Sequence, residues 1–169
     1  MKKVIVLVAF LVFASCSSDD DQKQLILTGS GSNSVEYTFN GKKMSSFDAD
    51  EDSEEILCDV SKTYTWIYFK LGKNNEYATL TLSSSTAFEE GKTYSIKGNL
   101  NSNVSASNEF YGPNIPYISC STNNEIGGTI TIVKLDFTNR IIAAKFSYDC
   151  VDAKGTIYTI RDGWFDLKF

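Results

Sequence analysis

The chain has 169 residues, 42% of them hydrophobic, which fits one domain with a sizeable core. Its 16 basic and 21 acidic side chains give a net charge of −5, so it lacks the basic surface that phosphate binding requires, and we expect no nucleic-acid ligand. Histidine is absent, which excludes Ser-His-Asp and Cys-His catalysis and every histidine metal site.

Residues 1–15 have the pattern of a signal peptide. Two lysines precede the apolar run 4–13, and the small residues Ala14 and Ser15 follow it. A helix needs about 20 apolar residues to cross the hydrocarbon core of a bilayer, so this run is too short for a permanent span. We therefore expect the protein to be exported.

The residues around Cys16 resemble the lipobox of bacterial lipoproteins, in which the cysteine is acylated and becomes the mature N-terminus. Phe13 departs from the aliphatic residue that is usual three positions before that cysteine. Fatty-acid chains on Cys16, palmitate among them, would hold the protein to a bilayer, since each buried methylene contributes about 0.8 kcal/mol. The alternative is an ordinary secreted protein cut near Ala14, with Cys16 as a disulfide partner.

Residues 17–21, Ser-Ser-Asp-Asp-Asp, resemble the acidic export signal that sends Bacteroidetes-type lipoproteins to the outside of the outer membrane. As plain chemistry the same run is a solvated, self-repelling tether. Residues 16–34 are mostly polar and small, and we interpret them as a flexible link from the anchor to a domain at 35–169. The expected location is the outer membrane, lipid-anchored and exposed at the cell surface.

The domain is predicted to be all-β. Short runs of β-branched and aromatic residues are divided by Gly, Asn, Asp and Lys, and no stretch keeps a 3.6-residue apolar period. Because antiparallel strands with one apolar face need a second sheet to cover it, we expect an antiparallel β-sandwich of nine or ten strands, with a lipocalin-like β-barrel as the alternative. Weaker strands are expected near residues 35–39, 56–60, 93–97 and 117–120.

The first hairpin that can be predicted with register joins residues 65–71 to residues 78–83. Pairing Phe69 with Leu80 makes one face wholly apolar. The opposite face then carries Trp66, Tyr68, Lys70, Thr79, Thr81 and Ser83.

The second predicted hairpin joins residues 128–136 to residues 141–150. Pairing Ile132 with Phe146 again makes one face apolar. A third hairpin leads into residues 156–161, and the alternation that follows predicts that the chain ends on a strand.

The C-terminal third resembles lipoproteins of gut and environmental Bacteroidetes that are grouped only as a domain of unknown function. The shared features are a Gly-Thr-Ile-Thr-Ile strand, an Asp-x-Thr-Asn turn, a Lys-Phe-Ser-Tyr strand and a closing Asp-Gly-Trp-Phe-Asp, at residues 128–132, 136–139, 145–148 and 162–166. Residues 37–46, YTFNGKKMSS, look like the opening strand and turn of the same group. The resemblance implies a β-sandwich on an outer-membrane anchor and carries no catalytic residues.

With Cys16 acylated, an odd number of cysteines remains in an oxidising compartment, and three pairings are open. The predicted register places Cys150 beside Gly128, at the end of the sheet that the strand of Cys120 reaches. Cys120 to Cys150 is therefore the favoured disulfide. Cys58 alternates with apolar residues and has no histidine to activate it, so we interpret it as a small buried hydrophobe.

The candidate binding platform consists of aromatic residues at polar positions. Trp66 and Tyr68 fall on the polar face of their hairpin, and Trp164 alternates with the apolar positions of the last strand. Exposed rings on a rigid sheet can stack against the faces of sugars. The alternative is that a second sheet or a long loop covers the rings. Residues 99–114, rich in Asn and Ser, are predicted to form a long loop of the kind that can carry recognition on a sandwich scaffold.

Asp48, Asp50 and Asp52 stand at alternate positions, like the start of a calcium loop. The match to an EF-hand fails, because Ser53 and Asp59 stand where that loop needs Gly and Glu. The remaining interpretations are a solvated acidic loop and a looser calcium site; no other cofactor is expected.

Two classes of function fit these features. The first is a non-catalytic surface lipoprotein that binds a glycan, a peptide or a partner subunit, as an accessory of an outer-membrane system. The second is a glycosidase-like hydrolase that uses two carboxylates, either two from residues 48–55 or Asp162 with Asp166. Such a pair must face one cleft at a separation of about 5 to 9 Å.

Overall fold

The computed structural model describes residues 27–50, 54–98 and 103–169. These residues form strands and no helix, so the described parts of the chain contain no helix that could cross a bilayer. The all-β prediction is confirmed. The strands are β1 (Ser34–Phe39), β2 (Lys42–Ser45), β3 (Glu55–Val60), β4 (Thr65–Lys73), β5 (Glu76–Ser84), β6 (Thr93–Ile96), β7 (Val104–Gly112), β8 (Ile115–Ser121), β9 (Gly128–Asp136), β10 (Ile141–Asp152) and β11 (Ile157–Lys168).

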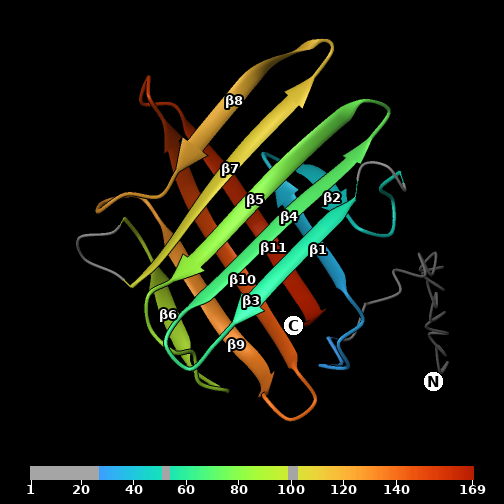
Figure 1. Cartoon of the computed structure of the whole chain (residues 1–169). Coiled ribbons are helices and arrows are strands. Elements are labelled where there is room, and N and C mark those ends of the chain that lie inside the picture. Colours follow the sequence, from blue (N-terminus) through green and yellow to red (C-terminus); the bar gives the residue numbers. More distant parts are fainter. Residues whose placement is uncertain (1–26, 51–53, 99–102) are drawn as a thin grey trace, which may run out of the picture.

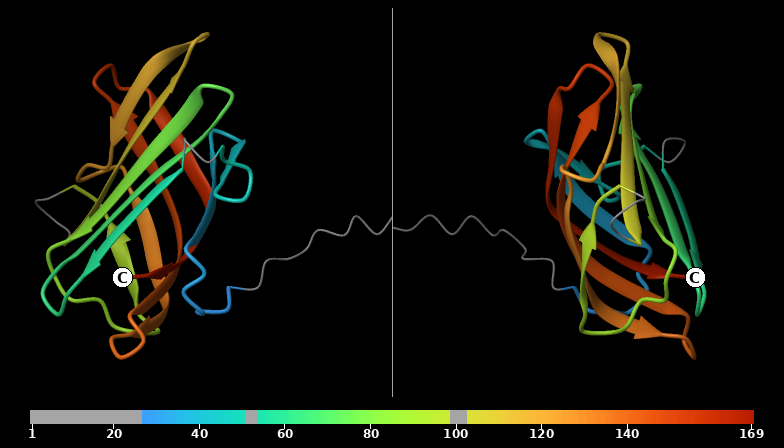
Figure 2. Two further views of the ribbon diagram at one scale, coloured as in Figure 1. Left: turned by 45° about the vertical axis from the view of Figure 1, so that its right-hand side comes forward. Right: turned by 90° about the vertical axis from the view of Figure 1, so that its left-hand side faces the viewer.

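The strands lie in two layers, which Figure 1 shows one in front of the other. The front layer contains β3, β4, β5, β7 and β8, and the back layer contains β2, β1, β11, β10, β9 and β6. Hydrogen bonds between β6 and β7, and between β8 and β10, join the layers along one side. At the other side the hydrogen-bonded path ends on β2 and β3. The described residues contain eleven strands, against the nine or ten predicted, in one hydrogen-bonded sheet folded into two layers, an arrangement that fits the predicted sandwich and its barrel-like alternative. Figure 2 shows the two layers from the edge.

The core fills the space between the layers with side chains from alternate positions. Phe69 of β4 packs on Phe165 of β11 with ring centroids 5.8 Å apart, and Phe39 of β1 stacks on Phe110 of β7 at 5.4 Å. All four rings are buried. Each such side chain contributes about 1.5 to 3 kcal/mol through burial, so the contacts across the layers hold the sandwich together.

The register predicted for the β4–β5 hairpin is confirmed. Phe69 pairs with Leu80 and Ile67 pairs with Leu82. All four side chains are fully buried. The side chains at the alternating positions of both strands therefore point away from the core.

The register predicted for the β9–β10 hairpin is wrong by two residues. Phe146 pairs with Ile130, not with Ile132. The turn contains four residues, 137–140, one fewer than the predicted pairing requires, and this shifts the register by one residue. A bulge at Val133 shifts it by one more. From Ala144 onward the shift is two residues and keeps every side chain on its predicted face. Between the turn and the bulge the shift is one residue, so Leu135 instead of Lys134 packs against the core.

The loop predicted at residues 99–114 is also wrong, because residues 104–112 form β7, which lies between β5 and β8 in the front layer. Residues 99–102 lie outside the described part of the chain. Buried Asn108 on β7 donates to the Thr79 carbonyl at 3.2 Å and accepts from the Tyr148 hydroxyl of the back layer. The remaining buried side chains of β7 are Val104, Ala106 and Phe110.

The last residues of the predicted tether are fastened to the back layer. The carboxylate of Asp166, on β11 and only 2% exposed, accepts the backbone N–H groups of Ser30 at 2.9 Å and Gly31 at 2.7 Å. It also accepts the Thr28 hydroxyl at 3.2 Å. The predicted signal peptide, the acylated Cys16 and the rest of the tether up to residue 26 lie outside the described residues.

Candidate functional site

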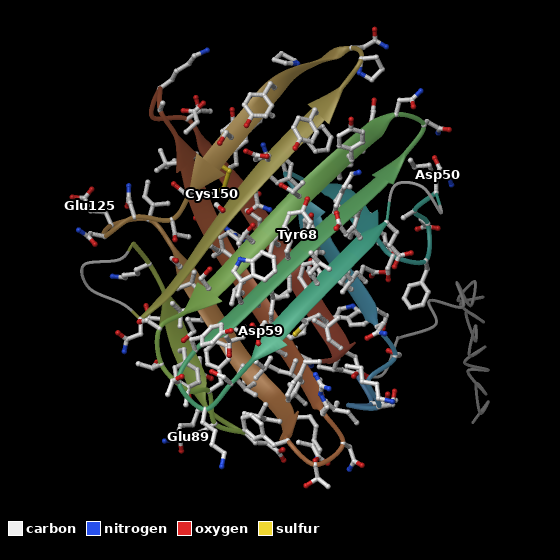
Figure 3. All side chains as sticks on the ribbon, in the orientation of Figure 1. Asp50, Asp59, Tyr68, Glu89, Glu125 and Cys150 are labelled. Atoms are coloured by element: carbon white, nitrogen blue, oxygen red, sulfur yellow. A yellow bond between two sulfur atoms is a disulfide. The ribbon has the colours of Figure 1, made fainter. Side chains whose placement is uncertain are left out.

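Trp66 and Tyr68 project from β4 on the outer face of the front layer. Their neighbour Ile67 points into the core and is fully buried, whereas Trp66 is 36% exposed. The two rings are nearly parallel, with centroids 6.1 Å apart and planes inclined by 6°. Figure 3 shows Tyr68 on the face of the molecule turned toward the viewer. The two rings thus form a fixed, partly exposed aromatic pair.

Hydroxyl side chains continue from this pair across the sheet. Ser83 on β5 is the partner of Trp66, and Ser105 on β7 is the partner of Ser83. One step along the strands, Tyr68 is followed in the same way by Thr81 and Ser107. The aromatic pair therefore borders a strip of serine and threonine hydroxyls, each able to donate and to accept a hydrogen bond.

Two shallow hollows follow the strip. The first, of about 630 Å³, is lined by Tyr64, Trp66 and Asn103 together with serines. The second, of about 190 Å³, is lined mainly by Ser and Thr side chains of β5, β7 and β8. Ser83 and Ser105 line both, so the two hollows adjoin. We call these adjoining hollows the hydroxyl groove; Trp66 lines the first hollow, and Tyr68 is the strand partner of Thr81, which lines the second.

Tyr64 adds a third ring at the end of the hydroxyl groove. Its hydroxyl donates to the Asp59 carboxylate on the neighbouring strand, and this hydrogen bond raises the pKa of Tyr64 above the ordinary value of 10.0. Burial raises the pKa of Tyr68, with the carboxylates of Glu55 and Glu109 adding to the effect. Both phenols therefore stay neutral at physiological pH.

A second aromatic cluster occupies the opposite end of the same face. Tyr111 lies 4.8 Å from Tyr77 and 5.5 Å from Tyr117, measured between ring centroids. The Glu109 carboxylate accepts the hydroxyls of Tyr111 at 3.0 Å and Tyr117 at 2.7 Å. The Lys70 ammonium lies 5.2 Å from the Tyr77 ring centroid. Burial and the bond to Glu109 raise the pKa of Tyr111 to about 12.

Sequence reasoning missed this second cluster. Tyr111 falls in the segment that was predicted to be a loop, so no face could be assigned to it. The position of Tyr77 could have been predicted. Extending the predicted β4–β5 register by one pair places Tyr77 opposite Gly72, on the same face as Trp66.

Trp164 does not join the other two rings. It projects from β11 on the outer side of the back layer, opposite Glu36 and Lys145, and its ring lies 6.4 Å from that of Phe47. It lines a separate cleft of about 890 Å³ with Val133 and Asp162 among the lining residues. The predicted platform thus contains Trp66 and Tyr68 on one layer, and Trp164 lies on the other.

The predicted calcium loop places the carboxylate of Asp50 in a structural role. Asp50 accepts the backbone N–H of Asn74 at 2.9 Å and donates its own N–H to the Gly72 carbonyl, which ties the loop to the β4–β5 turn. Asp48 lines a pocket of about 500 Å³ together with three lysines, an unfavourable setting for a cation. Asp52 lies outside the described residues. Within the described ranges, no three acidic or cysteine side chains are grouped to hold a metal ion.

The disulfide between Cys120 and Cys150 is confirmed, and it links β8 to β10 with a Cα–Cα distance of 5.3 Å. Figure 3 shows it as the yellow bond beside the label of Cys150. Cys58 is a free thiol, partly buried against the core. Burial raises its pKa to about 12, so it stays protonated and is a poor nucleophile.

Asp162 and Asp166, one of the two carboxylate sets considered for hydrolysis, are not arranged as a catalytic pair. Both oxygens of Asp166 accept hydrogen bonds from residues 28–31. Asp162 lies four positions earlier on the same strand, at a β-bulge where its φ is 52°, and lines the cleft of Trp164, which Asp166 does not line. Glycosidase carboxylates lie about 5 to 9.5 Å apart across one cleft.

Comparisons with known proteins do not assign the chain to a family. No protein-family model, no curated protein and no solved structure matches it. The candidate site therefore rests on its own geometry and chemistry.

Proposed function

We propose that this protein is a non-catalytic, lipid-anchored module of the cell surface that binds glycans in the hydroxyl groove. The observation that carries the proposal is the parallel pair of Trp66 and Tyr68 beside a strip of serine and threonine hydroxyls. A sugar ring has an apolar C–H face and polar hydroxyl edges. In the hydroxyl groove the aromatic rings match the apolar face, and the serine and threonine hydroxyls match the polar edges.

The aromatic pair supplies the contact with the apolar face of a sugar. Aromatic pairs gain about 0.5 to 1.5 kcal/mol beyond area burial, and a stacked sugar buries comparable apolar surface against an indole ring. The Trp66 ring already stacks beside the Tyr68 ring at 6.1 Å, which reduces the side-chain entropy that binding would cost.

The hydroxyl strip supplies hydrogen bonds to the sugar edges. The described lining residues of the two hollows are mainly hydroxyl side chains, with Asn103 and two aromatic rings, and they include no carboxylate. Such groups recognise sugar hydroxyls without supplying an acid and base pair for hydrolysis. This chemistry supports a binding role in preference to a hydrolase.

The position of the N-terminal segment is compatible with an anchor at Cys16. Residues 28–31 are bound to Asp166 on the outer side of the back layer, whereas Trp66 lies on the outer side of the front layer. The described start of the chain, residues 27–33, therefore does not cover the hydroxyl groove.

A glycan array probed with the purified full chain tests the binding function. Trp66→Ala is expected to lower affinity for the bound glycans about tenfold, which corresponds to about 1.4 kcal/mol. Trp164→Ala, which removes a tryptophan from the other layer, is the matched control and should bind as the wild type does. Equal binding by folded Trp66→Ala protein would contradict the proposal.

Metabolic labelling with radioactive palmitate, followed by protease treatment of intact cells, tests the location. The wild type should carry label and be digested from outside, and Cys16→Ser should carry none. An unlabelled wild-type protein, or one shielded from protease on intact cells, would overturn the surface anchor.

A further inference from the structure

The two aromatic clusters mark the two ends of one continuous face. Trp66, Ser83 and Ser105 share one row of paired residues, and Tyr77 and Tyr111 share another. The second row lies six positions further along β7. At about 3.3 Å per residue, the rows are about 20 Å apart, a span that needs several linked sugar rings.

Polar side chains on β5 and β7 connect the two ends, with the exposed Leu57 at the β3 edge of the face. The row next to Trp66 contains Tyr68, Thr81 and Ser107, and the following row contains Lys70 and Glu109. Every row of the face thus offers at least one hydrogen-bonding group. A ligand that follows the strands could be held along its whole length.

The charges on this face favour a ligand without acidic groups. Three carboxylates project from it, those of Glu55, Asp59 and Glu109, whereas the opposing charge on these rows is that of Lys70. Uronic or sulfated sugars would meet net repulsion here. A neutral sugar pays no such penalty.

Glu109 gives the second cluster a fixed geometry. Its two carboxylate oxygens accept one hydroxyl each from Tyr111 and Tyr117, whose rings are inclined by only 21°. Tyr117 is nevertheless 59% exposed. A ring that is both oriented and exposed is suited to stacking on a flat ligand.

We infer that the front layer binds a neutral, linear glycan lengthwise, with one part of the chain stacked on Trp66 and Tyr68 and another on Tyr111 and Tyr117. This inference rests on the proposed glycan-binding function and specifies its ligand. A short oligosaccharide reaches one cluster only. A longer chain reaches both, and its second contact forms at a high effective concentration, so affinity rises with length.

Titration calorimetry of the full chain with glycans of graded length tests this inference. The probes are linear glucose, mannose and xylose oligomers from the disaccharide upward, with hyaluronan oligosaccharides as the anionic arm. Neutral oligomers long enough to span about 20 Å are expected to bind at least tenfold more tightly than the disaccharide of the same sugar. The anionic oligosaccharides should bind more weakly than neutral ones of the same length.

Tyr117→Ala is the variant that separates the inference from the proposed function. It should lower the affinity for long oligomers to that of short ones and leave the short ones unchanged, while Trp66→Ala weakens both. Phe137→Ala, at another exposed ring (42%), is the matched control and should alter neither. Thermal unfolding of each variant verifies that the fold is retained.

Each outcome decides one of the two claims. The lengthwise mode would be overturned if affinity did not depend on oligomer length, or if Tyr117→Ala bound long oligomers as the wild type does. The proposed glycan-binding function would still stand if Trp66→Ala weakened binding. Tighter binding of hyaluronan would overturn the neutral class. Binding of no oligomer in the series would overturn both.

Discussion

Removing the disulfide between Cys120 and Cys150 is expected to lower the free energy of unfolding by about 3.6 kcal/mol. The bond closes a loop with a sequence separation of 30 residues. The chain-entropy relation gives about 3.6 kcal/mol at 25 °C for a loop of that length. At 2 to 4 °C per kcal/mol, the melting temperature should fall by roughly 7 to 14 °C.

The position of the bond in the fold reinforces this expectation. β8 pairs with β10 over only two residue pairs, those of Val151 with Ser121 and of Asp152 with Cys120. Few hydrogen bonds would therefore remain to hold β8 against β10 once the disulfide is removed. The rest of β8 is held by β7 alone.

Guanidinium unfolding followed by tryptophan fluorescence measures the effect. Reductant should bring the wild type to the midpoint of the Cys120→Ala/Cys150→Ala double variant and have no effect on that variant. Cys58→Ala is the matched control, and it should respond to reductant as the wild type does. The reasoning is refuted if the wild-type midpoint stays the same after thiol titration shows that the bond is reduced.

Two buried contacts and the titrating side chains give the remaining predictions. Asp166→Ala should cost about 2 to 4 kcal/mol in denaturant unfolding, because two backbone N–H groups lose a charged acceptor; an unchanged midpoint would show that the segment before β1 is not fastened. Gly163→Ala would place a methyl carbon 2.4 Å from the Phe146 ring, so it should lower the free energy of unfolding by about 1 to 3 kcal/mol. An unchanged free energy of unfolding would show that the Phe146 ring can move aside. Burial raises the pKa of Tyr148 well above 10.0, so stability is full below that pH and falls above it as the unfolded chain ionises. Backbone N–H groups lower the pKa of Asp152 below 3.8, so stability is full above that pH and falls below it. Because the chain has no histidine, its melting temperature should not change between roughly pH 5 and 9. A change within that range would contradict the pKa shifts given for Tyr148 and Asp152 as the source of the pH dependence.

Alternation of apolar and polar residues was enough to predict the strands that pack large side chains. The register of the β4–β5 hairpin was predicted correctly, since only one register buries Phe69 and Leu80 together, although the strands extend further toward the turn than predicted. The same logic placed Trp66 and Tyr68 on an outer face. The disulfide was also predicted, although the register used for it was wrong by two residues.

The predictions failed where the structure depends on contacts that a local sequence pattern does not show. β7 alternates small polar residues such as Ser105 and Ser107 with a buried strand face that includes Asn108, so its hydrophobic period is weak. The bulge at Val133 has no glycine or proline beside it that would mark it in the sequence. Which layer a strand joins depends on long-range pairing, and for that reason Trp164 could not be separated from Trp66 in advance.

The most direct test of the central claim is backbone chemical-shift mapping of the isotope-labelled protein with a neutral linear oligosaccharide. Binding in the hydroxyl groove predicts the largest shift changes at Trp66, Tyr68, Ser83 and Ser105, with the residues around Trp164 unaffected. Changes centred on Trp164 and Lys145, or none at saturating oligosaccharide, would contradict the account.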